Sequence, residues 1–486
     1  MIYKRKDRSD SFTRELSLTP SISARRQFIL DNGTTIDNIK SWLCKIQWKI
    51  LLGTFMIWLL LVQYMERNYV KNVIQRCHWD QWEQWNDNSD DNKPHRIALV
   101  ADPQIIDDYS YQGRPAMFNY FVKKITDNYL HRNHMYMQEY IDPDNVIFLG
   151  DLFDGGRQWD NDYWFDEYQR YNRIFPKKVN RLTISSIPGN HDIGFDTMDI
   201  KTVNRFALFN GELNDVIELG NHTFILLDTI SLSSLDPKIS KEPREFLDNI
   251  NTKIMNPSLP KILLMHVPFY RFNDRQLCGP LRESKQKFPI QKGVQYQTVI
   301  SHELTKEVLT KIGPSIAFAG DDHDYCDIQQ PYMYKNQPKV AREITVKSVA
   351  MSSGIKYPAI QLLSLNNPTD QLNEKNQETY QTKMCYMPHP YISIRLYVLL
   401  YFIILGGLII EYIVPNKKNQ IISLLHRESN QSPTLNLPTF DEEKVKSYRK
   451  SEPLSTEVAD IPMFTIHLTI VTIIPIFILN FYYKNI

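Results

Sequence analysis

The chain has 486 residues, of which 42% are hydrophobic and 23% are charged, so it is long enough to bury the core of one large domain or two ordinary ones. Its formal net charge of +1 creates no overall field that would attract nucleic acid, and we expect no nucleic-acid partner. Local charge is more informative, because basic side chains outnumber acidic ones before residue 50 and an apolar run follows them.

That apolar run, ILLGTFMIWLLLV, covers 50–62 and with its flanks is just long enough to span a bilayer. No small-residue cleavage site comes after it, so we interpret 46–65 as an uncleaved signal anchor, with a buried core helix as the alternative. Residues 66–94 are polar and rich in tryptophan. We expect them to form a stalk near the membrane surface, and packing on the following domain is the other interpretation.

From residue 95 the pattern changes to β-rich apolar runs that alternate with helix-like segments. Apolar residues at helical spacing predict a helix over 116–130, and Ser301 is placed to cap a second helix that Gly313 and Pro314 would end. Continuous apolar strands suit a sheet that is covered on both faces, so we predict an α/β fold with two packed sheets flanked by helices. The expected strands cover 96–101, 146–149, 182–187, 223–227, 261–265, 315–319 and 344–351.

Two more apolar stretches near the C-terminus predict further transmembrane helices. The positive-inside rule keeps the basic N-terminal arm, and the basic loop between those two stretches, in the cytosol, which places the central domain across the membrane. The expected organisation is a cytosolic tail at 1–45, a transmembrane helix at 46–65, a lumenal stalk at 66–94, a lumenal domain at 95–390, a transmembrane helix at 391–414, a cytosolic loop at 415–461, a transmembrane helix at 462–483 and a lumenal tail at 484–486.

Two features of the central domain are typical of an oxidising lumen. Asn221 begins an Asn-His-Thr sequon and is predicted to be glycosylated. The chain has five cysteines, and Cys77, Cys278, Cys326 and Cys385 fall on the lumenal side. They permit two disulfides in any of three pairings, with free buried thiols as the alternative.

Five short segments each place a metal-binding side chain at the end of an apolar run, where open α/β sheets hold their ligands. Hydrolysis of a phosphate ester needs a nucleophile at neutral pH, neutralised phosphoryl oxygens and a proton for the leaving oxygen. Two metal ions about 3.5–4 Å apart supply the first two, and a nearby histidine supplies the third. The segments are ADPQ at 101–104, GDLFDGG at 150–156, PGNHD at 188–192, MHVP at 265–268 and GDDH at 320–323.

Each segment taken alone has a simpler explanation. An aspartate after a strand is often a helix cap, Asn190 and His191 are compatible with a turn, and a lone His266 with a hydrogen-bonded core histidine. Contacts to the backbone amides of its own loop would explain Asp154. Their joint occurrence in one order, each after a predicted strand, favours a site with two metal ions.

The five segments together resemble the motifs of the calcineurin-like metallophosphoesterases, over the part of the chain from Asp102 to His323. The resemblance implies a hydrolase acting on phosphoric ester bonds, a four-layer α/β/β/α sandwich, here with flanking transmembrane helices, and attack by a hydroxide that bridges the two metals. Carried over by position, Asp102 and His323 bind the first metal, Asp151 bridges both, Asn190 and His266 bind the second, His191 is the general acid, and Asp192 orients it. Apart from this resemblance, Arg157 is a candidate contact for the phosphate or the glycan.

Two positions depart from that family pattern, because Gln104 and Asp321 stand where the family has histidines. Each change replaces an imidazole with an oxygen ligand. An oxygen-rich site suits a harder ion, so we expect Mn²⁺ rather than Zn²⁺. We assign Asp321 as a metal ligand, and Gln104 is either a ligand or a neighbour of one.

The ADPQ opening, GDLFDGGR, GDDHDYC and the flanking apolar helices resemble a narrower group, the fungal cell-division-control-type proteins related to the animal post-GPI-attachment phosphoesterase. This resemblance implies Mn²⁺-dependent removal of ethanolamine phosphate from a mannose of GPI anchors. The partners would be GPI-anchored proteins or the GPI glycan, and the lipid bilayer of the endoplasmic reticulum. Two alternatives stay open, a lumenal phosphomonoesterase acting on another lipid, glycan or protein, and a non-catalytic adaptor in the sorting of GPI-anchored proteins.

Overall fold

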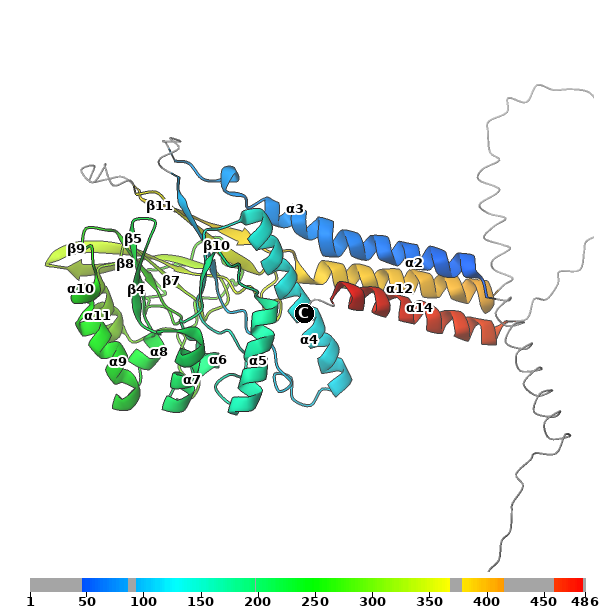
Figure 1. The fold of residues 1–486 in the computed structure, drawn as a ribbon, viewed down its shortest axis with the longest axis horizontal. Coiled ribbons are helices and arrows are strands. Elements are labelled where there is room, and N and C mark those ends of the chain that lie inside the picture. The colour runs from blue at the N-terminus through cyan, green and yellow to red at the C-terminus, as the bar shows by residue number, and fades with distance from the viewer. Residues whose placement is uncertain (1–45, 86–92, 197, 368–377, 415–458, 484–486) are drawn as a thin grey trace, which may run out of the picture. The chain divides into compact units, whose positions relative to one another are not determined.

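The computed structural model describes residues 46–85, 93–196, 198–367, 378–414 and 459–483 (Figure 1). They divide into a larger unit, made of the described residues between 59 and 400 and of 477–483, and a smaller one, made of 46–58, 401–414 and 459–476. Two β-sheets form the centre of the larger unit, and each contains both parallel and antiparallel strand pairs. In the five-stranded sheet the order is β11-β10-β1-β2-β3, and in the six-stranded sheet it is β4-β5-β6-β7-β9-β8.

The strands that matter most for the site are β1, β2, β6 and β7. β1 pairs with β2 in parallel in one sheet, and β6 pairs with β7 in parallel in the other. The bounds are β1 His95–Val100, β2 Asn145–Phe148, β3 Leu182–Ile184, β4 Asp215–Leu219, β5 His222–Leu226, β6 Lys261–Leu264, β7 Ile316–Ala319, β8 Cys326–Tyr334, β9 Gln337–Thr345, β10 Ala359–Leu365 and β11 Tyr380–Tyr386.

The two sheets pack face to face and helices cover their outer faces. Alternate residues of β1, such as Ile97 and Leu99, share one buried cluster with Phe224 of β5 and Leu264 of β6, so this cluster fills the space between the sheets. The intervening residues, such as Val100, belong to a second cluster that also contains helical side chains. This alternation produces the four layers that the sequence predicted, and the fold class is confirmed.

The helix α11 begins and ends where its capping residues predict, whereas the helix expected over 116–130 continues to Tyr136. Ser301 Oγ accepts a hydrogen bond from the Leu304 amide at 3.1 Å, and Gly313 adopts a left-handed φ of 67° at the other end of α11. The helices of the larger unit are α3 Tyr69–Gln75, α4 Ala116–Tyr136, α5 Asn161–Ile174, α6 Asn190–Ile193, α7 Ile200–Asn210, α8 Thr229–Leu232, α9 Pro237–Asp248, α10 Ile250–Lys253 and α11 His302–Ile312, with short turns of other helix types at Tyr64–Asn68, Trp79–Gln81 and Met137–Ile141.

Several antiparallel strands were not predicted. Of the strand expected at 344–351, only Ile344 and Thr345 lie in a named strand, as the last two residues of β9, which begins at Gln337. In β8 buried residues alternate with exposed or half-buried ones along CDIQQPYMY, and the first residues of β9 are exposed. Strands with one solvated face carry fewer apolar residues than strands buried on both faces, so β4, β8 and β11 gave weaker signals. β10 is buried along its whole length, but the polar Gln361 and Ser364 interrupt its apolar run.

The segment expected to be a stalk at the membrane surface is packed on the domain over its described part, so the stalk interpretation of 66–94 is corrected there. Trp79 is fully buried in the core, and its Nε1 donates to the Ile141 carbonyl at 2.6 Å. Cys77 forms a disulfide with Cys385 of β11. These contacts make Trp79 part of the core, which agrees with the alternative that the sequence left open.

Three helices are long and apolar enough to cross a membrane, by length and composition. They are the helical stretch Trp48–Gln75, which begins with α2 (Trp48–Gln63), then α12 (Pro390–Tyr412) and α14 (Ile461–Tyr482). Each overlaps a stretch for which the sequence predicted a transmembrane helix. The predicted cytosolic tail 1–45 and the loop 415–458 lie outside the described residues. In the smaller unit, His467 is buried with its ring 4.9 Å from that of Tyr412.

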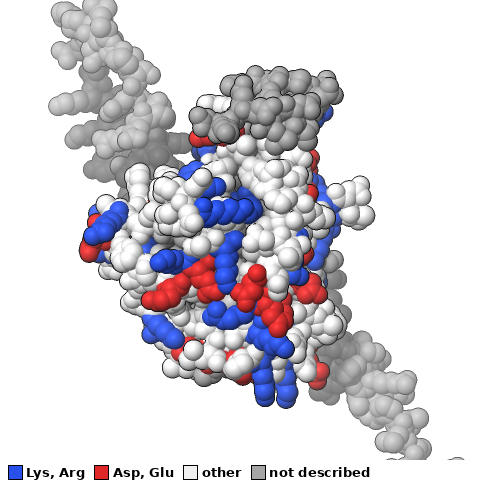
Figure 2. All heavy atoms as spheres, turned by 90° about the vertical axis from the view of Figure 1, so that its left-hand side faces the viewer, with Lys and Arg blue, Asp and Glu red and all other residues white. Residues whose placement is uncertain are grey.

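The surface of one end of the molecule carries both signs of charge. Figure 2 shows acidic and basic side chains side by side on this face, without one extended basic field. Ion pairs of the larger unit include Arg342 with Asp327 and Lys311 with Glu307, both at 2.7 Å. A face of this kind offers no continuous track for a polyanion.

Candidate active site

The candidate metal ligands come from both sheets and meet at one edge. Asp102 follows β1, Asp151 follows β2, His266 follows β6 and Asp321 follows β7. Because parallel strands end at the same edge, the loops after them converge from distant parts of the chain. The sequence-predicted segments are therefore brought together by the fold.

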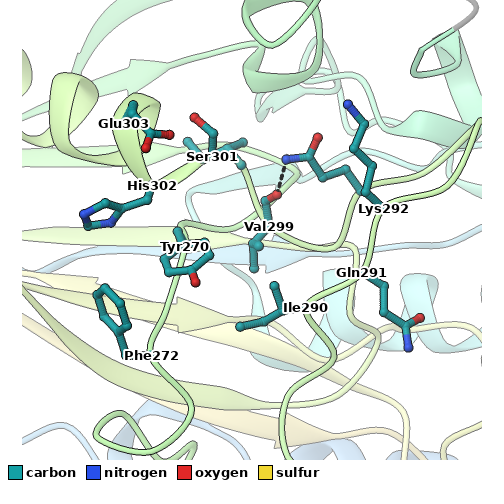
Figure 3. Close-up of a pocket in the computed structure, with 11 residues that line it drawn as sticks. Tyr270, Phe272, Ile290, Gln291, Lys292, Val299, Ser301, His302 and Glu303 are labelled. Carbon is teal, nitrogen blue, oxygen red and sulfur yellow. Dashed lines mark hydrogen bonds between the residues drawn. The ribbon is translucent and has the colours of Figure 1, made fainter.

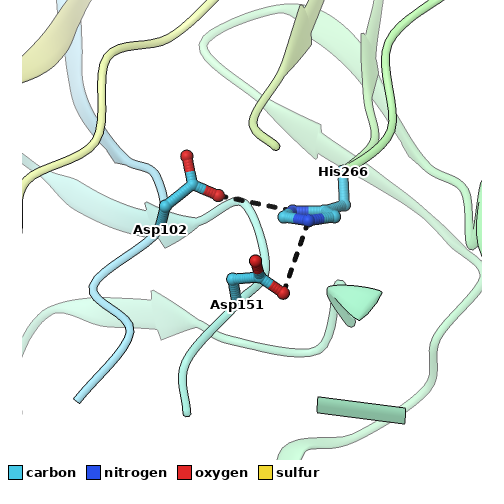
Figure 4. Close-up of side chains that lie close together, drawn as sticks. All are labelled: Asp102, Asp151 and His266. Carbon is cyan, nitrogen blue, oxygen red and sulfur yellow. Dashed lines mark ion pairs between the residues drawn. The ribbon is translucent and has the colours of Figure 1, made fainter. Parts of the chain in front are cut away.

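His266 lies between the carboxylates (Figure 4). Its Nδ1 is 3.7 Å from Asp102 Oδ1, and its Nε2 is 3.4 Å from Asp151 Oδ1 and 3.7 Å from Asp321 Oδ1. Ligand atoms of Asp102, Asp151 and His266 all lie within 4.8 Å of one another, and all three residues are buried. Nδ1 of His266 also contacts the Leu149 carbonyl at 2.7 Å, which leaves Nε2 as the atom able to bind a cation.

Asp151 is held from two sides. The His191 amide donates to its Oδ1 at 2.9 Å, and Gln104 Nε2 donates to its Oδ2 at 2.9 Å. Gln104 thus contacts a predicted ligand through its amide nitrogen. A direct contact of Gln104 with a metal stays a prediction.

Asn190, the first residue of α6, and His323, in the loop after β7, come from two further segments. Asn190 Nδ2 donates to the Gln295 carbonyl at 3.1 Å, and His323 Nδ1 contacts the Ser353 carbonyl at 3.2 Å. Each of these contacts to a backbone carbonyl occupies one polar atom of the side chain and orients the other polar atom. Asn190 Oδ1 and His323 Nε2 are therefore the atoms offered to a ligand.

The backbone of these loops is held in an unusual conformation. Asp102, Asp151, Asp321 and His323 have φ values of 48°, 51°, 70° and 63°. A non-glycine residue in the left-handed region costs on the order of 1 kcal/mol or more and persists only where its surroundings dictate it. Gly189 is needed because another group approaches its backbone closely: a Cβ at this position would clash with the Asp151 carboxylate.

Burial and mutual repulsion control the protonation of the acidic ligands. Burial raises the pKa of Asp102 well above its usual range and that of Asp321 to about 7, and the Asp151 charge adds to both. Burial acts against ionisation of Asp151 too, but the charges of His266 and His191 outweigh it and lower its pKa. Three carboxylates gather in this cluster, and divalent cations would add the positive charge that stabilises their ionised forms.

The pKa values of the imidazoles of His323 and His266 shift in opposite directions. Burial lowers the pKa of His323, which keeps the ring neutral as a metal ligand must be. Burial would also lower the pKa of His266, but the charge of Asp151 and the hydrogen bond to it, followed by Asp102 and Asp321, raise it well above its usual range. In the absence of metal a proton on His266 therefore balances the carboxylates, and metal binding must release that proton.

His191 is the candidate general acid, and its partner is Asp154. Its Nδ1 lies 2.6 Å from the Asp154 carbonyl and 3.2 Å from Asp154 Oδ1. Burial lowers the pKa of His191, but the Asp151 charge and the hydrogen bond to Asp154 outweigh this and raise it to about 9. The ring is thus protonated at neutral pH, as a proton donor to a leaving oxygen must be.

The assignment of Asp192 as the residue that orients His191 is corrected. The Asp192 carboxylate accepts the amides of Gly189 at 2.8 Å, Phe153 at 3.0 Å and Leu152 at 3.2 Å. It joins the loops that carry Asn190 and Asp151, whereas Asp154 makes the ring contact. The two aspartates exchange the roles given to them from the sequence, where Asp154 was explained by backbone amides.

Comparison with known proteins agrees with this geometry. A model of the family described as calcineurin-like phosphoesterase matches residues 95–325. Cell division control protein 1 of Saccharomyces cerevisiae is 45% identical over 453 residues, covering 89% of this chain and 91% of that protein. The chain belongs to the calcineurin-like metallophosphoesterase family. Metallophosphoesterase 1 is 24% identical over 341 residues in Danio rerio, covering 65% of this chain and 80% of that protein, and 21% identical over 336 residues in Mus musculus, covering 65% and 78%.

As a member of this family the chain is a hydrolase of phosphoester bonds, and its donor set suits divalent metals. Asp102 Oδ2 and Asn190 Oδ1 are buried and have no hydrogen-bond partner among the described residues. Buried polar atoms without partners are costly, and bound cations would satisfy both. The identity of each ligand and of the ion stays a prediction.

Arg157 and Asn221 have different surroundings. Arg157 Nη1 donates to the Asn190 carbonyl at 3.2 Å, and its amide donates to the His191 carbonyl at 3.0 Å. It therefore lies beside the candidate general acid, where a substrate contact was predicted. Asn221 is exposed in the turn between β4 and β5, and its Nδ2 donates to the Asn367 carbonyl at 2.8 Å.

Two cavities differ in their relation to the site. One of about 440 Å³ is lined by His323 together with residues of 282–289 and 353–356. Another of about 460 Å³ lies around Tyr270, Phe272 and His302 and includes none of the predicted metal ligands (Figure 3). A substrate that reaches the ligands would therefore occupy the first cavity.

Proposed function

We propose that the protein is a membrane-bound phosphodiesterase of the endoplasmic reticulum that removes ethanolamine phosphate from a mannose of GPI anchors. The observation that carries this proposal is a binuclear-type phosphoesterase site in a chain with three helices apolar enough to cross a membrane. The resemblance to the fungal cell-division-control-type group supplies the substrate. A membrane-tethered hydrolase is well placed to meet a membrane-tethered glycan.

Two divalent cations, when bound, supply an activated water and neutralise the phosphoryl oxygens. Asp102, Asp151, Asn190, His266, Asp321 and His323 would hold them. Four of these six side chains offer oxygen, which favours Mn²⁺ over a softer ion.

The side chains of this protein then handle the proton. Oxygen from water joins phosphorus as the bond to the mannose oxygen breaks, and His191 gives its proton to that leaving oxygen. Asp154 holds Nδ1 of His191, so Nε2 is the atom that faces the substrate. Arg157, beside His191, is placed to contact a phosphoryl oxygen.

We infer that the catalytic domain faces the lumen. The basic N-terminal arm predicts this orientation, and the pairs Cys77–Cys385 and Cys278–Cys326 suit an oxidising compartment. The exposed sequon at Asn221 gives a direct test. In a cell extract, a glycosidase that removes N-linked glycans should increase the mobility of the wild type and leave Asn221→Gln unchanged.

The activity test uses the full chain purified in detergent with Mn²⁺. We expect release of ethanolamine phosphate from a mannose-linked GPI glycan, detected by mass spectrometry, at a higher kcat/KM than hydrolysis of a simple phosphomonoester. Preference for the monoester would favour a phosphomonoesterase. Full rescue of a strain lacking the protein by Asp151→Asn would favour a non-catalytic adaptor.

A further inference from the structure

The cavity beside His323 has a rim that is built from two loops far apart in sequence. Residues of 282–289 form one side and 353–356 form the other, with Tyr357 directly after the second segment, and we name these two segments the rim loops. Ser353 also contacts His323 through its carbonyl, at 3.2 Å from Nδ1. One rim loop therefore fixes a predicted metal ligand and borders the cavity at once.

Buried charges fasten the rim loops to each other. Glu283 accepts the Lys356 and Tyr357 amides at 2.9 and 3.0 Å. The fully buried Lys347 pairs with Glu283 and with Asp324, the latter at 3.2 Å. A buried ammonium group is costly unless both partners stay in place, so this arrangement holds the two loops at a fixed separation.

Further links tie the first rim loop to the segment that carries His323. Arg282 forms a two-point ion pair with Asp322. The Asp324 carboxylate accepts the Ser284 amide at 2.8 Å, and Cys278 is joined to Cys326. The cavity is therefore preorganised, which is what a site for a specific part of a substrate requires.

Aromatic rings continue from the rim toward α12. The Tyr357 ring is 6.3 Å from Tyr386 and 5.3 Å from His389, and His389 is 6.0 Å from Tyr391. Tyr357, Tyr386 and Tyr391 are 46%, 38% and 40% exposed.

We propose that the rim loops and Tyr357 form a subsite for the sugar part of the substrate, with Tyr357 as the ring on which a sugar stacks. The C–H face of a sugar packs on the electron-rich face of an aromatic ring, and charged side chains such as Lys356 bind hydroxyls. The charged lining argues against an acyl chain as occupant. The choice of a sugar rests on the proposed function, because a mannose-linked phosphate would place the glycan next to His323.

The test measures competition by a sugar that carries no phosphate. Full-length protein in detergent with Mn²⁺ hydrolyses bis(4-nitrophenyl) phosphate as reporter, and an α-linked mannose oligosaccharide is added. We expect the oligosaccharide to raise the KM of the wild type without changing kcat. In Tyr357→Ala the inhibition constant should rise about tenfold, the size expected for the loss of one stacked ring.

Two variants control for general damage. Tyr357→Phe keeps the ring and should keep the inhibition, and Phe165→Ala removes an aromatic ring of similar exposure, 43%, from α5 and should change nothing. Absence of competition in the wild type, or equal effects of Tyr357→Ala and Phe165→Ala, would overturn the proposal. So would a result in which only lipid-linked mannose competes, which would assign the surface to the membrane.

The outcome is separable from that of the proposed function. Competition that depends on Tyr357, without release of ethanolamine phosphate, would keep the sugar subsite and reject the reaction. Release of ethanolamine phosphate without any competition would keep the reaction and reject the subsite.

Discussion

The metal-facing loops and the rim loops meet at His323, but they are held in place by different means. The metal-facing loops are short turns at strand ends, where Asp102 and Asp151 adopt left-handed backbone conformations. The rim loop 282–289 belongs to a long segment without helix or strand, and ion pairs and a disulfide hold it. The sheets thus fix the chemistry, while side-chain pairs fix the shape of the cavity. We expect changes in the first region to affect every phosphate ester, and changes in the second to affect only some.

The largest effect is expected for Asp151→Asn. Removing one electrostatic contact to a transition state costs roughly 10²–10³-fold in rate, and this change weakens both cation positions at once. The kcat/KM of the glycan substrate and the kcat/KM of the simple diester should both fall by more than about 10³-fold. Asp162→Asn, an exposed carboxylate on α5, is the matched control. Selective loss of only one substrate would contradict the division between the two regions.

His191→Gln should reduce turnover by about 10²-fold, within the range for loss of a general acid, when the leaving oxygen is a sugar alkoxide. The same variant should lose far less on bis(4-nitrophenyl) phosphate, because nitrophenolate leaves without a proton. This difference comes from leaving-group chemistry, so a short alkyl phosphodiester without a sugar should behave like the glycan. Equal losses on all of these substrates would show that His191 does not act as the acid.

Asp321 and Asp322 are neighbours that belong to different regions. Asp321 Oδ1 lies 3.7 Å from His266 Nε2, whereas Asp322 pairs with Arg282. Asp321→Asn should weaken Mn²⁺ binding by at least about tenfold, measured by metal content after dialysis. Asp322→Asn should keep the metal and change the KM for the glycan alone. Full metal occupancy with normal turnover in Asp321→Asn would remove it from the ligand set.

The sequence predicted the parts of this architecture that local pattern determines. The strands β1, β2, β6 and β7 are buried on both faces, so their apolar runs were visible and the metal-binding side chains after them could be placed. The partner of His191 could not be found in this way. Asp154 and Asp192 both lie near it in the motifs, and only the folded loops decide which carboxylate contacts the ring.

The rim was also beyond prediction from sequence. Glu283 and Lys347 are 64 positions apart and neither stands in a motif. Their pairing depends on how β9 and the long segment before α11 pack, which is a tertiary property. The disulfides show the same limit, because the even count of cysteines left three pairings open and the fold selects Cys77–Cys385 and Cys278–Cys326.

The contacts of Asp154 and Asp192 give the prediction with the smallest expected effect, and this prediction distinguishes the two residues directly. The pKa of His191 is raised to about 9, so its proton is available below that pH and is lost as the pH rises through it. Asp154→Asn removes one of the interactions that raise this pKa. The alkaline limb of the kcat profile should therefore move to lower pH, with about a tenfold loss at the original optimum.

Asp192→Asn should leave that limb in place, because the Asp192 carboxylate accepts backbone amides of Gly189, Leu152 and Phe153 instead of contacting the ring. An asparagine keeps only one acceptor oxygen, so we expect a loss of about 1–3 kcal/mol in the free energy of unfolding, seen as a lower Tm. If Asp192→Asn moved the limb while Asp154→Asn lowered only the Tm, the contact seen between Asp154 and His191 would not be the one that operates during turnover. The roles implied by the family resemblance would then be restored.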